Sequence, residues 1–144
     1  MEYEELKDRI KLHEGFVPKI YKDSLGKKTI GYGHLITPTD KFKEDKIYSS
    51  AELKRVFEYD FKIALDGARR ICEFDKLHPK AQEVVIECVF VLGARGFSLF
   101  KRCLGHLNEG RYANGAEELK DSLWGKKQAN NRVSALCEIL ESIK

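Results

Sequence analysis

Residues 13–34, which read HEGFVPKIYKDSLGKKTIGYGH, decide the fold of the N-terminal part of the chain. Short runs of β-forming residues flank the segment DSLG at 23–26, where Asp at the first position and Gly at the fourth are typical of a type I turn. The stretch therefore predicts a β-hairpin. It places one carboxylate, Glu14, just past a helix, a second, Asp23, at the turn, and a hydroxyl, Thr29, on the returning strand.

Spacings of three and four between apolar residues predict that most of the remaining chain is helical. Ser49 and Glu52 form a capping box that opens the longest of these helices. Gly93 ends the helix with the densest apolar stripe, which follows the break at His78-Pro79. The long helix can join an N-terminal β-containing lobe to a C-terminal helical lobe. The predicted helices cover residues 3–13, 50 to about 70 or 72, 81–92, 100–107, 112–119 and 131–143.

The composition of the 144 residues fits one domain with a buried core, since 42% of them are hydrophobic. A formal net charge of +3 gives weak attraction to anionic polymers and argues against a nucleic-acid partner. No apolar run is long enough for a signal-peptide core or a membrane span. We therefore expect synthesis in the cytoplasm without a signal peptide, and no stable membrane insertion.

The cysteines argue against a metal site, because no pair has Cys-x-x-Cys spacing and no histidine pattern accompanies them. Cys88 and Cys137 fall on apolar helical stripes, so we interpret them as small buried hydrophobes. Disulfides are the less favoured alternative. The four cysteines are Cys72, Cys88, Cys103 and Cys137.

Glu14, Asp23 and Thr29 supply the groups that hydrolysis of a glycosidic bond needs. A carboxylic acid protonates the leaving oxygen, and an ionised carboxylate, here helped by a hydroxyl, holds water or supports the developing positive charge. These roles require Glu14 to be protonated in a partly desolvated place and Asp23 to be ionised near solvent. Spacing alone is weak evidence, because the chain has 23 acidic residues and Asp often caps such turns.

A longer pattern of residues carries more information than the spacing of the two acids. Together its residues resemble the active-site signature of the phage lysozymes, glycoside hydrolase family twenty-four. Further matches to that family's helical lobe extend the resemblance over nearly all of the chain. The N-terminal matches are Glu14-Gly15, Tyr21-Lys22-Asp23, Gly26 and Thr29-Ile30-Gly31-Tyr32-Gly33-His34; the C-terminal ones are 90–93, Gly96, Phe100 and 124–132.

The resemblance implies a lysozyme fold of class α+β, mainly α, with a small N-terminal β-hairpin sheet. A single domain over 1–144 is expected, with a β-containing lobe over about 14–60. The helical lobe is expected over about 61–144, together with the N-terminal helix.

The same resemblance implies a peptidoglycan hydrolase, or muramidase, that cleaves the β-1,4 bond between N-acetylmuramic acid and N-acetylglucosamine and lyses the bacterial cell wall. Glu14 is implied as the general acid, with Asp23 and Thr29 completing the catalytic site and inversion at the anomeric carbon. No metal or cofactor is implied. The enzyme is expected to act on peptidoglycan as a monomer after its release to the wall.

Other site residues follow from the same likeness. Leu35 and Phe90 are implied as sugar contacts, although a core position is an equal alternative for Phe90. Arg132 is implied to lie beside Glu14 and position it, with an exposed arginine at a helix start as the alternative. His34 is expected to be structural, with Asp60 of the long helix as its hydrogen-bond partner.

Two positions depart from the pattern of the family's saccharide cleft. Cys103 and Glu118 stand where a serine and an asparagine are expected. The departures leave the preferred glycan subsite and peptide stem open.

Two rival functions are weighed against muramidase activity. A lytic transglycosylase needs an acid but no supporting Asp and Thr, so Asp23 and Thr29 argue against it. A non-catalytic wall-binding or structural module with the same fold is expected to lack Glu14, Asp23 or Thr29, and all three are present.

Overall fold

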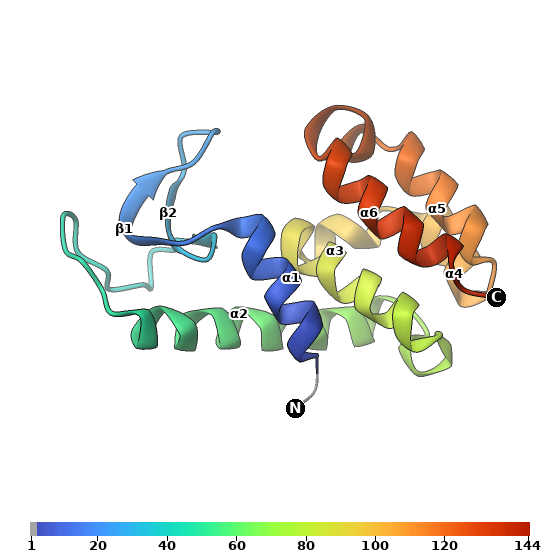
Figure 1. Ribbon diagram of the computed structural model, residues 1–144, viewed down its shortest axis with the longest axis horizontal. Helices are drawn as coiled ribbons and strands as arrows, with labels where there is room; N and C mark the ends of the chain where they lie inside the picture. The colour runs from blue at the N-terminus through green and yellow to red at the C-terminus, as the bar shows by residue number, and fades with distance from the viewer. Residues whose placement is uncertain (1–2) are drawn as a thin grey trace. The chain divides into compact units, whose positions relative to one another are not determined.

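The computed structural model describes residues 3–144, which are mainly helical with one small sheet, as predicted (Figure 1). The chain divides into unit 1, which ends at Lys62, and unit 2, which begins at Ile63. The elements are α1 (Glu4–Glu14), β1 (Val17–Lys22), β2 (Lys28–Gly31), β3 (His34–Leu35), α2 (Ser50–Ile71), η1 (Phe74–Lys76), α3 (Pro79–Ser98), α4 (Lys101–Asn108), α5 (Tyr112–Asp121), η2 (Trp124–Gln128) and α6 (Asn130–Glu141).

The sheet of unit 1 is antiparallel with the order β1-β2-β3. The predicted turn joins its first two strands, because the N–H of Gly26 donates to the carbonyl of Asp23 over 2.9 Å. Gly26 has a φ of 79°, which a residue with a side chain rarely adopts. In the register Tyr21 lies opposite Thr29, and Thr29 lies opposite Leu35. β3 therefore adds a short third strand to the hairpin that the sequence predicted.

The predicted capping box begins α2 and holds this helix against the sheet. The N–H of Glu52 donates to Oγ of Ser49 over 3.1 Å, and the N–H of Ser49 donates to Oε1 of Glu52 over 3.4 Å. One turn further on, Leu53 packs with Ile30 of β2 and with Tyr48 in a small buried cluster. The sheet therefore packs an apolar face on α2.

Unit 2 is an all-helical bundle in which α5 packs against α4 and α6, and α3 packs against α6 (Figure 1). α3 begins where Nδ1 of His78 accepts a hydrogen bond from the N–H of Lys80 over 3.0 Å. Its regular path breaks at the predicted helix end, Gly93, where φ is 80° and ψ is 156°. A second helical piece then continues to Ser98. The most buried core side chains of unit 2 include Val84, Val85, Cys88, Ala116, Leu119, Cys137 and Leu140.

The segment predicted only to separate the last two helices contains a π-helical turn, η2. The chain coils closely against the end of α5 at this point, since a Cβ on Gly125 would lie 3.2 Å from the carbonyl oxygen of Lys120 and also overlap that of Leu119. Only a glycine admits such an approach of two backbones. The π-helical turn depends on this close packing, which the periodicity of the sequence does not reveal.

All four cysteines are free; Cys88 and Cys137 are buried, as expected for small hydrophobes, and Cys103 is buried as well. Burial, with a smaller effect from Cys137 and Glu118, raises the pKa of Cys103 to about 12. These thiols are therefore packing groups and weak nucleophiles. Within residues 3–144, no helix is both long and apolar enough to cross a membrane.

Candidate active site

Glu14 is the last residue of α1, and the helix ends there because of the glycine that follows. Gly15 has a φ of 74°, and its N–H donates to the carbonyl of Lys11 over 2.9 Å. This left-handed backbone turns the chain directly into β1, which begins at Val17. The partly buried Glu14 side chain therefore stands at the junction between helix and sheet.

The turn between β2 and β3 lies directly against this carboxyl group. A Cβ added at Gly33 would overlap Oε1 of Glu14 and lie 3.2 Å from its Cδ. Gly33 also has a φ of 73°, so a side chain is disfavoured here for two independent reasons. The backbone of Gly33 removes water from one side of the Glu14 carboxyl group.

Asp23 caps the hairpin turn, as its position in the turn predicted. Its Oδ1 accepts hydrogen bonds from the N–H groups of Leu25 and Lys27, each over 2.9 Å. Oδ2 makes no hydrogen bond to any residue between 3 and 144. Capping and catalysis are compatible here, because the backbone fixes the carboxylate through one oxygen and the other can accept from a ligand.

Thr29 is the most buried of the three candidate residues, with 4% of its surface exposed. Its Oγ1 donates to the carbonyl of Lys27 over 3.1 Å. The hydroxyl proton is therefore used by the backbone, while the oxygen keeps lone pairs that can accept from water.

Tyr21 connects these groups electrostatically. Burial raises the pKa of Tyr21, and the negative charges of Glu14 and Asp23 raise it further. Both carboxylates therefore act on one phenol, and its register partner is Thr29. Unit 1 thus gathers Glu14, Asp23 and Thr29 around β1 and β2.

His34 makes the predicted contact with Asp60 and a second one that the sequence did not predict. Its Nδ1 lies 2.7 Å from Oδ2 of Asp60, and its Nε2 lies 2.9 Å from Oδ2 of Asp40. The hydrogen bond with Asp60 is the main cause that raises the pKa of His34 to about 9; burial opposes the shift and Asp40 adds to it. His34 therefore ties β3 to both α2 and the loop that follows the sheet.

Asp40 is held in place by that loop as well as by the histidine. Burial alone would raise the pKa of Asp40, but hydrogen bonds from the Thr37 N–H, over 2.8 Å, and from His34 outweigh it and lower the pKa. The carboxylate is thus ionised beside a protonated imidazole. No sequence pattern predicted the contact between His34 and Asp40, because the loop that carries Asp40 must first fold back onto the sheet.

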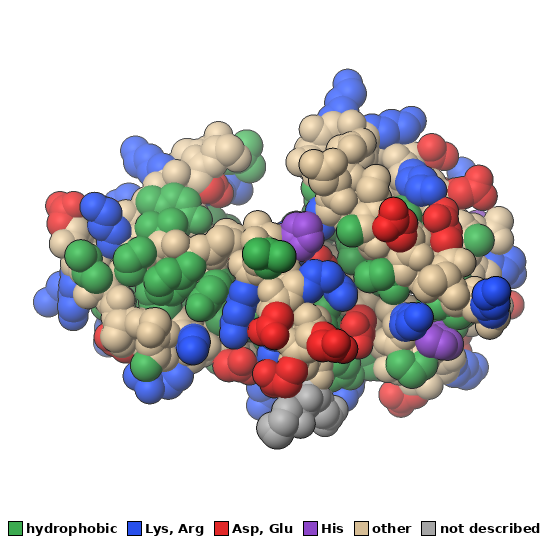
Figure 2. All heavy atoms as spheres, in the orientation of Figure 1, with side chains coloured by type: hydrophobic (Ala, Val, Ile, Leu, Met, Phe, Trp, Pro, Cys, Tyr) green, Lys and Arg blue, Asp and Glu red, His purple; other side chains and the backbone are tan. Residues whose placement is uncertain are grey.

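The two implied sugar contacts have different surroundings. Leu35 on β3 is 48% exposed, in agreement with a side chain that can contact a ligand. Phe90 is partly buried in α3 of unit 2, where both alternatives for it stay open. On the face drawn in Figure 2, hydrophobic side chains gather over the sheet of unit 1 and the start of α2.

Arg132 is not an exposed arginine at a helix start. Its Nε donates to Oε2 of Glu87 over 2.9 Å, and the side chains are 11% and 1% exposed respectively. The implied contact of Arg132 with Glu14 joins the two units and stays a prediction. Glu87 was not predicted from the sequence, although a charged residue inside the apolar stripe of α3 indicates a buried partner.

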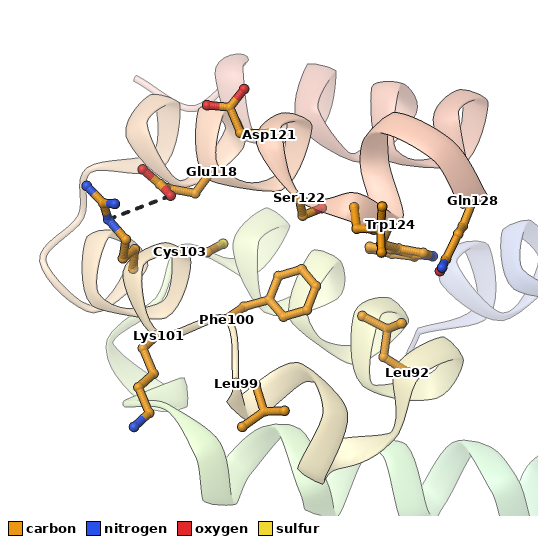
Figure 3. Close-up of a pocket in the computed structure, with 12 residues that line it drawn as sticks. Leu92, Leu99, Phe100, Lys101, Cys103, Glu118, Asp121, Ser122, Trp124 and Gln128 are labelled. Atoms are coloured by element: carbon orange, nitrogen blue, oxygen red, sulfur yellow. Dashed lines mark ion pairs between the residues drawn. The ribbon is translucent and has the colours of Figure 1, made fainter.

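Cys103 and Glu118, the two departures from the family pattern, line one pocket of about 490 Å³ in unit 2 (Figure 3). Phe100 and Trp124 form its apolar wall, with ring centroids 6.4 Å apart. Glu118 lies 3.9 Å from Nε of Arg102 at the rim. The pocket therefore combines an aromatic wall with charged side chains of both signs. Its part in glycan binding stays a prediction.

Comparison with known proteins gives one consistent result. A family model described as phage lysozyme matches residues 11–138, a range that contains Glu14, Asp23 and Thr29. The chain is 32% identical to a protein of Dictyostelium discoideum named "Probable T4-type lysozyme 2", over 92% of this chain and 93% of that protein. It is 28% identical to "Probable T4-type lysozyme 1" of the same organism, over the same shares of both chains.

Proposed function

Because the chain belongs to the phage lysozyme family and is therefore a lysozyme-type glycoside hydrolase, we propose that it is a muramidase that cleaves peptidoglycan. The bond is the β-1,4 linkage between N-acetylmuramic acid and N-acetylglucosamine. One observation carries the proposal: the Glu14 carboxyl group is lodged against the backbone of Gly33, beside a hairpin whose turn fixes Asp23. An acid and an anchored carboxylate are the pair that glycoside hydrolysis uses.

Glu14 is the general acid in this mechanism. The Gly33 backbone covers one side of its carboxyl group and excludes water there, which holds the acid in a fixed, partly desolvated place. Its proton passes to the glycosidic oxygen as the bond from the anomeric carbon to that oxygen breaks. The leaving sugar then departs as an alcohol, and Glu14 is left ionised.

Asp23 and Thr29 hold the attacking water on the opposite face of the sugar. With Oδ1 fixed by two N–H groups, Oδ2 of Asp23 accepts one water proton, and Oγ1 of Thr29 accepts the other as a hydrogen bond. Oxygen of the water bonds to the anomeric carbon, and Asp23 takes the proton. The product is an α-anomer, so the reaction inverts configuration.

The biological setting follows from the chemistry. A single copy of the chain carries all three groups of the site within unit 1, so we propose that it acts as a monomer. The target is the glycan strand of the bacterial wall, where cleavage of this linkage causes lysis. The protein acts there after release to the wall.

The new chain ends made from purified peptidoglycan test the proposal. The digest is reduced with borohydride, and the sugar at each new end is identified by mass spectrometry. Muramitol is the expected product. Glucosaminitol would contradict the proposed bond, 1,6-anhydromuramic acid would indicate a transglycosylase, and an undigested wall would indicate a non-catalytic module.

A further inference from the structure

Tyr21 shares one face of the hairpin with two residues of the site. It lies opposite Thr29 in the antiparallel register, so their side chains point to the same face. Asp23 follows two positions later, and its N–H donates to the carbonyl of Lys27 over 2.9 Å, which continues the ladder past the end of β1. Alternation along the strand then places Asp23 on the face of Tyr21 as well.

The hydroxyl of Tyr21 has no hydrogen bond to any residue that the structure describes. Its side chain is nevertheless partly buried, and the charges of both Glu14 and Asp23 act on it. The raised pKa means that this phenol keeps its proton throughout the pH range in which a wall hydrolase works. It is therefore a permanent O–H donor in the neighbourhood of two carboxylates.

The three candidate catalytic side chains themselves offer a substrate few donors. The proton of Thr29 is used by the carbonyl of Lys27, and the ionised Asp23 only accepts. In the proposed mechanism Glu14 gives its proton to the leaving oxygen. A saccharide presents acceptors as well as donors, namely its ring, hydroxyl and acetamido carbonyl oxygens, and these need an O–H or N–H partner.

We infer that Tyr21 is a substrate-binding residue of this site, whose phenol O–H donates a hydrogen bond to a sugar oxygen at the point of cleavage. The inference rests on the proposed function and adds a fourth side chain to Glu14, Asp23 and Thr29. The aromatic ring contributes apolar contact to the sugar, while the hydroxyl fixes its orientation between the two carboxylates. Tyr21→Phe keeps the ring and removes only the donor.

Steady-state hydrolysis of solubilised peptidoglycan tests this role. Tyr21→Phe should lower kcat/KM by about 3- to 10-fold, the worth of one hydrogen bond, with an unchanged melting temperature. Tyr59→Phe is the matched control, since Tyr59 is 66% exposed on α2 and should leave kcat/KM unchanged. A Tyr21→Phe enzyme with the wild-type kcat/KM would overturn the inference, and so would a loss of rate fully explained by a lower melting temperature.

The placement of the hydroxyl has a second test that does not depend on activity. With ¹³Cζ-labelled tyrosine, NMR titration should show that the pKa of Tyr21 falls in Glu14→Gln and also in Asp23→Asn. An unchanged Tyr21 titration in both variants would overturn the inference while leaving the muramidase proposal intact. Wild-type protein that hydrolyses no peptidoglycan would instead overturn the proposed function, whatever the titration shows.

Discussion

Arg132 and Glu87 form an ion pair that is almost entirely removed from solvent, with Nε of the arginine 2.9 Å from Oε2 of the glutamate. Removing the arginine takes this partner away from a charge buried in unit 2, at a cost of about 3 to 5 kcal/mol. Arg132→Met should therefore lower the free energy of unfolding by that amount, measured by urea denaturation. The double variant Arg132→Met/Glu87→Met should recover most of the loss, since it removes both charges. Equal stabilities of the single and double variants would show that the pair is not coupled.

The resemblance also implies that Arg132 acts on Glu14, and pH profiles of lysis can detect this. A guanidinium beside a carboxyl group favours its charged form, so removing the guanidinium favours the protonated acid. In Arg132→Ala the limb of the profile at which Glu14 loses its proton should move to higher pH. Glu87→Gln, which keeps the arginine, should move that limb much less. A profile that is identical in Arg132→Ala and the wild type would rule out the contact.

The two carboxylates that contact His34 should make the free energy of unfolding depend on pH. Because Asp60 and Asp40 raise the pKa of His34 from 6.5 to about 9, the histidine stabilises the fold fully below about pH 6.5. This contribution is lost as the pH rises through about 9, and it amounts to roughly 2 to 3 kcal/mol. The difference in unfolding free energy between the wild type and His34→Gln should therefore shrink between pH 6 and pH 9.5. A difference that stays constant would contradict the assignment.

The contribution of Asp40 to stability depends on pH in the opposite sense to that of His34. Its pKa is lowered because hydrogen bonds from Thr37 and His34 outweigh the effect of burial, so its contribution is present above its usual value of 3.8. This contribution of Asp40 is lost as the pH falls through its lowered pKa. His34 and Asp40 together stabilise unit 1 most in mildly acidic solution.

A side chain at position 33 should cause a selective loss of activity. In Gly33→Ala the new methyl group would overlap the Glu14 carboxyl group, so the acid must move and the rate of wall lysis should fall by about 100-fold. Gly110→Ala is the matched control, because Gly110 also has a positive φ, of 77°, but its added Cβ meets no atom within 4 Å. Both variants should lose about 1 kcal/mol or more of stability, measured by thermal unfolding. Equal lysis rates in the two variants would show that the Gly33 contact with Glu14 has no functional role.

Local signals allowed much of the fold to be predicted. The capping box at Ser49, the turn at Asp23 and the helix break at Gly93 each depend on backbone chemistry within a few residues, and each occurs where predicted. The partner of His34 on α2 was predicted as well. The catalytic roles of Glu14, Asp23 and Thr29 came from resemblance, because the spacing of two acids among 23 carries little information.

The remaining features depend on how the chain packs once its local elements have formed. Asp40 reaches His34 only because its loop returns to the sheet, and Glu87 meets Arg132 across 45 positions of sequence. The π-helical turn at Trp124 follows from close packing of Gly125 on α5. Glu87 was not predicted from the sequence, and no sequence pattern names its partner.

The central claim is that Glu14 delivers the proton that breaks the glycosidic bond, and Glu14→Gln tests it most directly. The amide keeps the shape of the side chain but has no proton to give. The control is Glu5→Gln, an exposed residue of the same helix, which should retain the wild-type rate. Measured on purified peptidoglycan, lysis by Glu14→Gln should fall by about 10² to 10⁴ while its melting temperature matches that of the control. Lysis by Glu14→Gln at the wild-type rate would contradict the account.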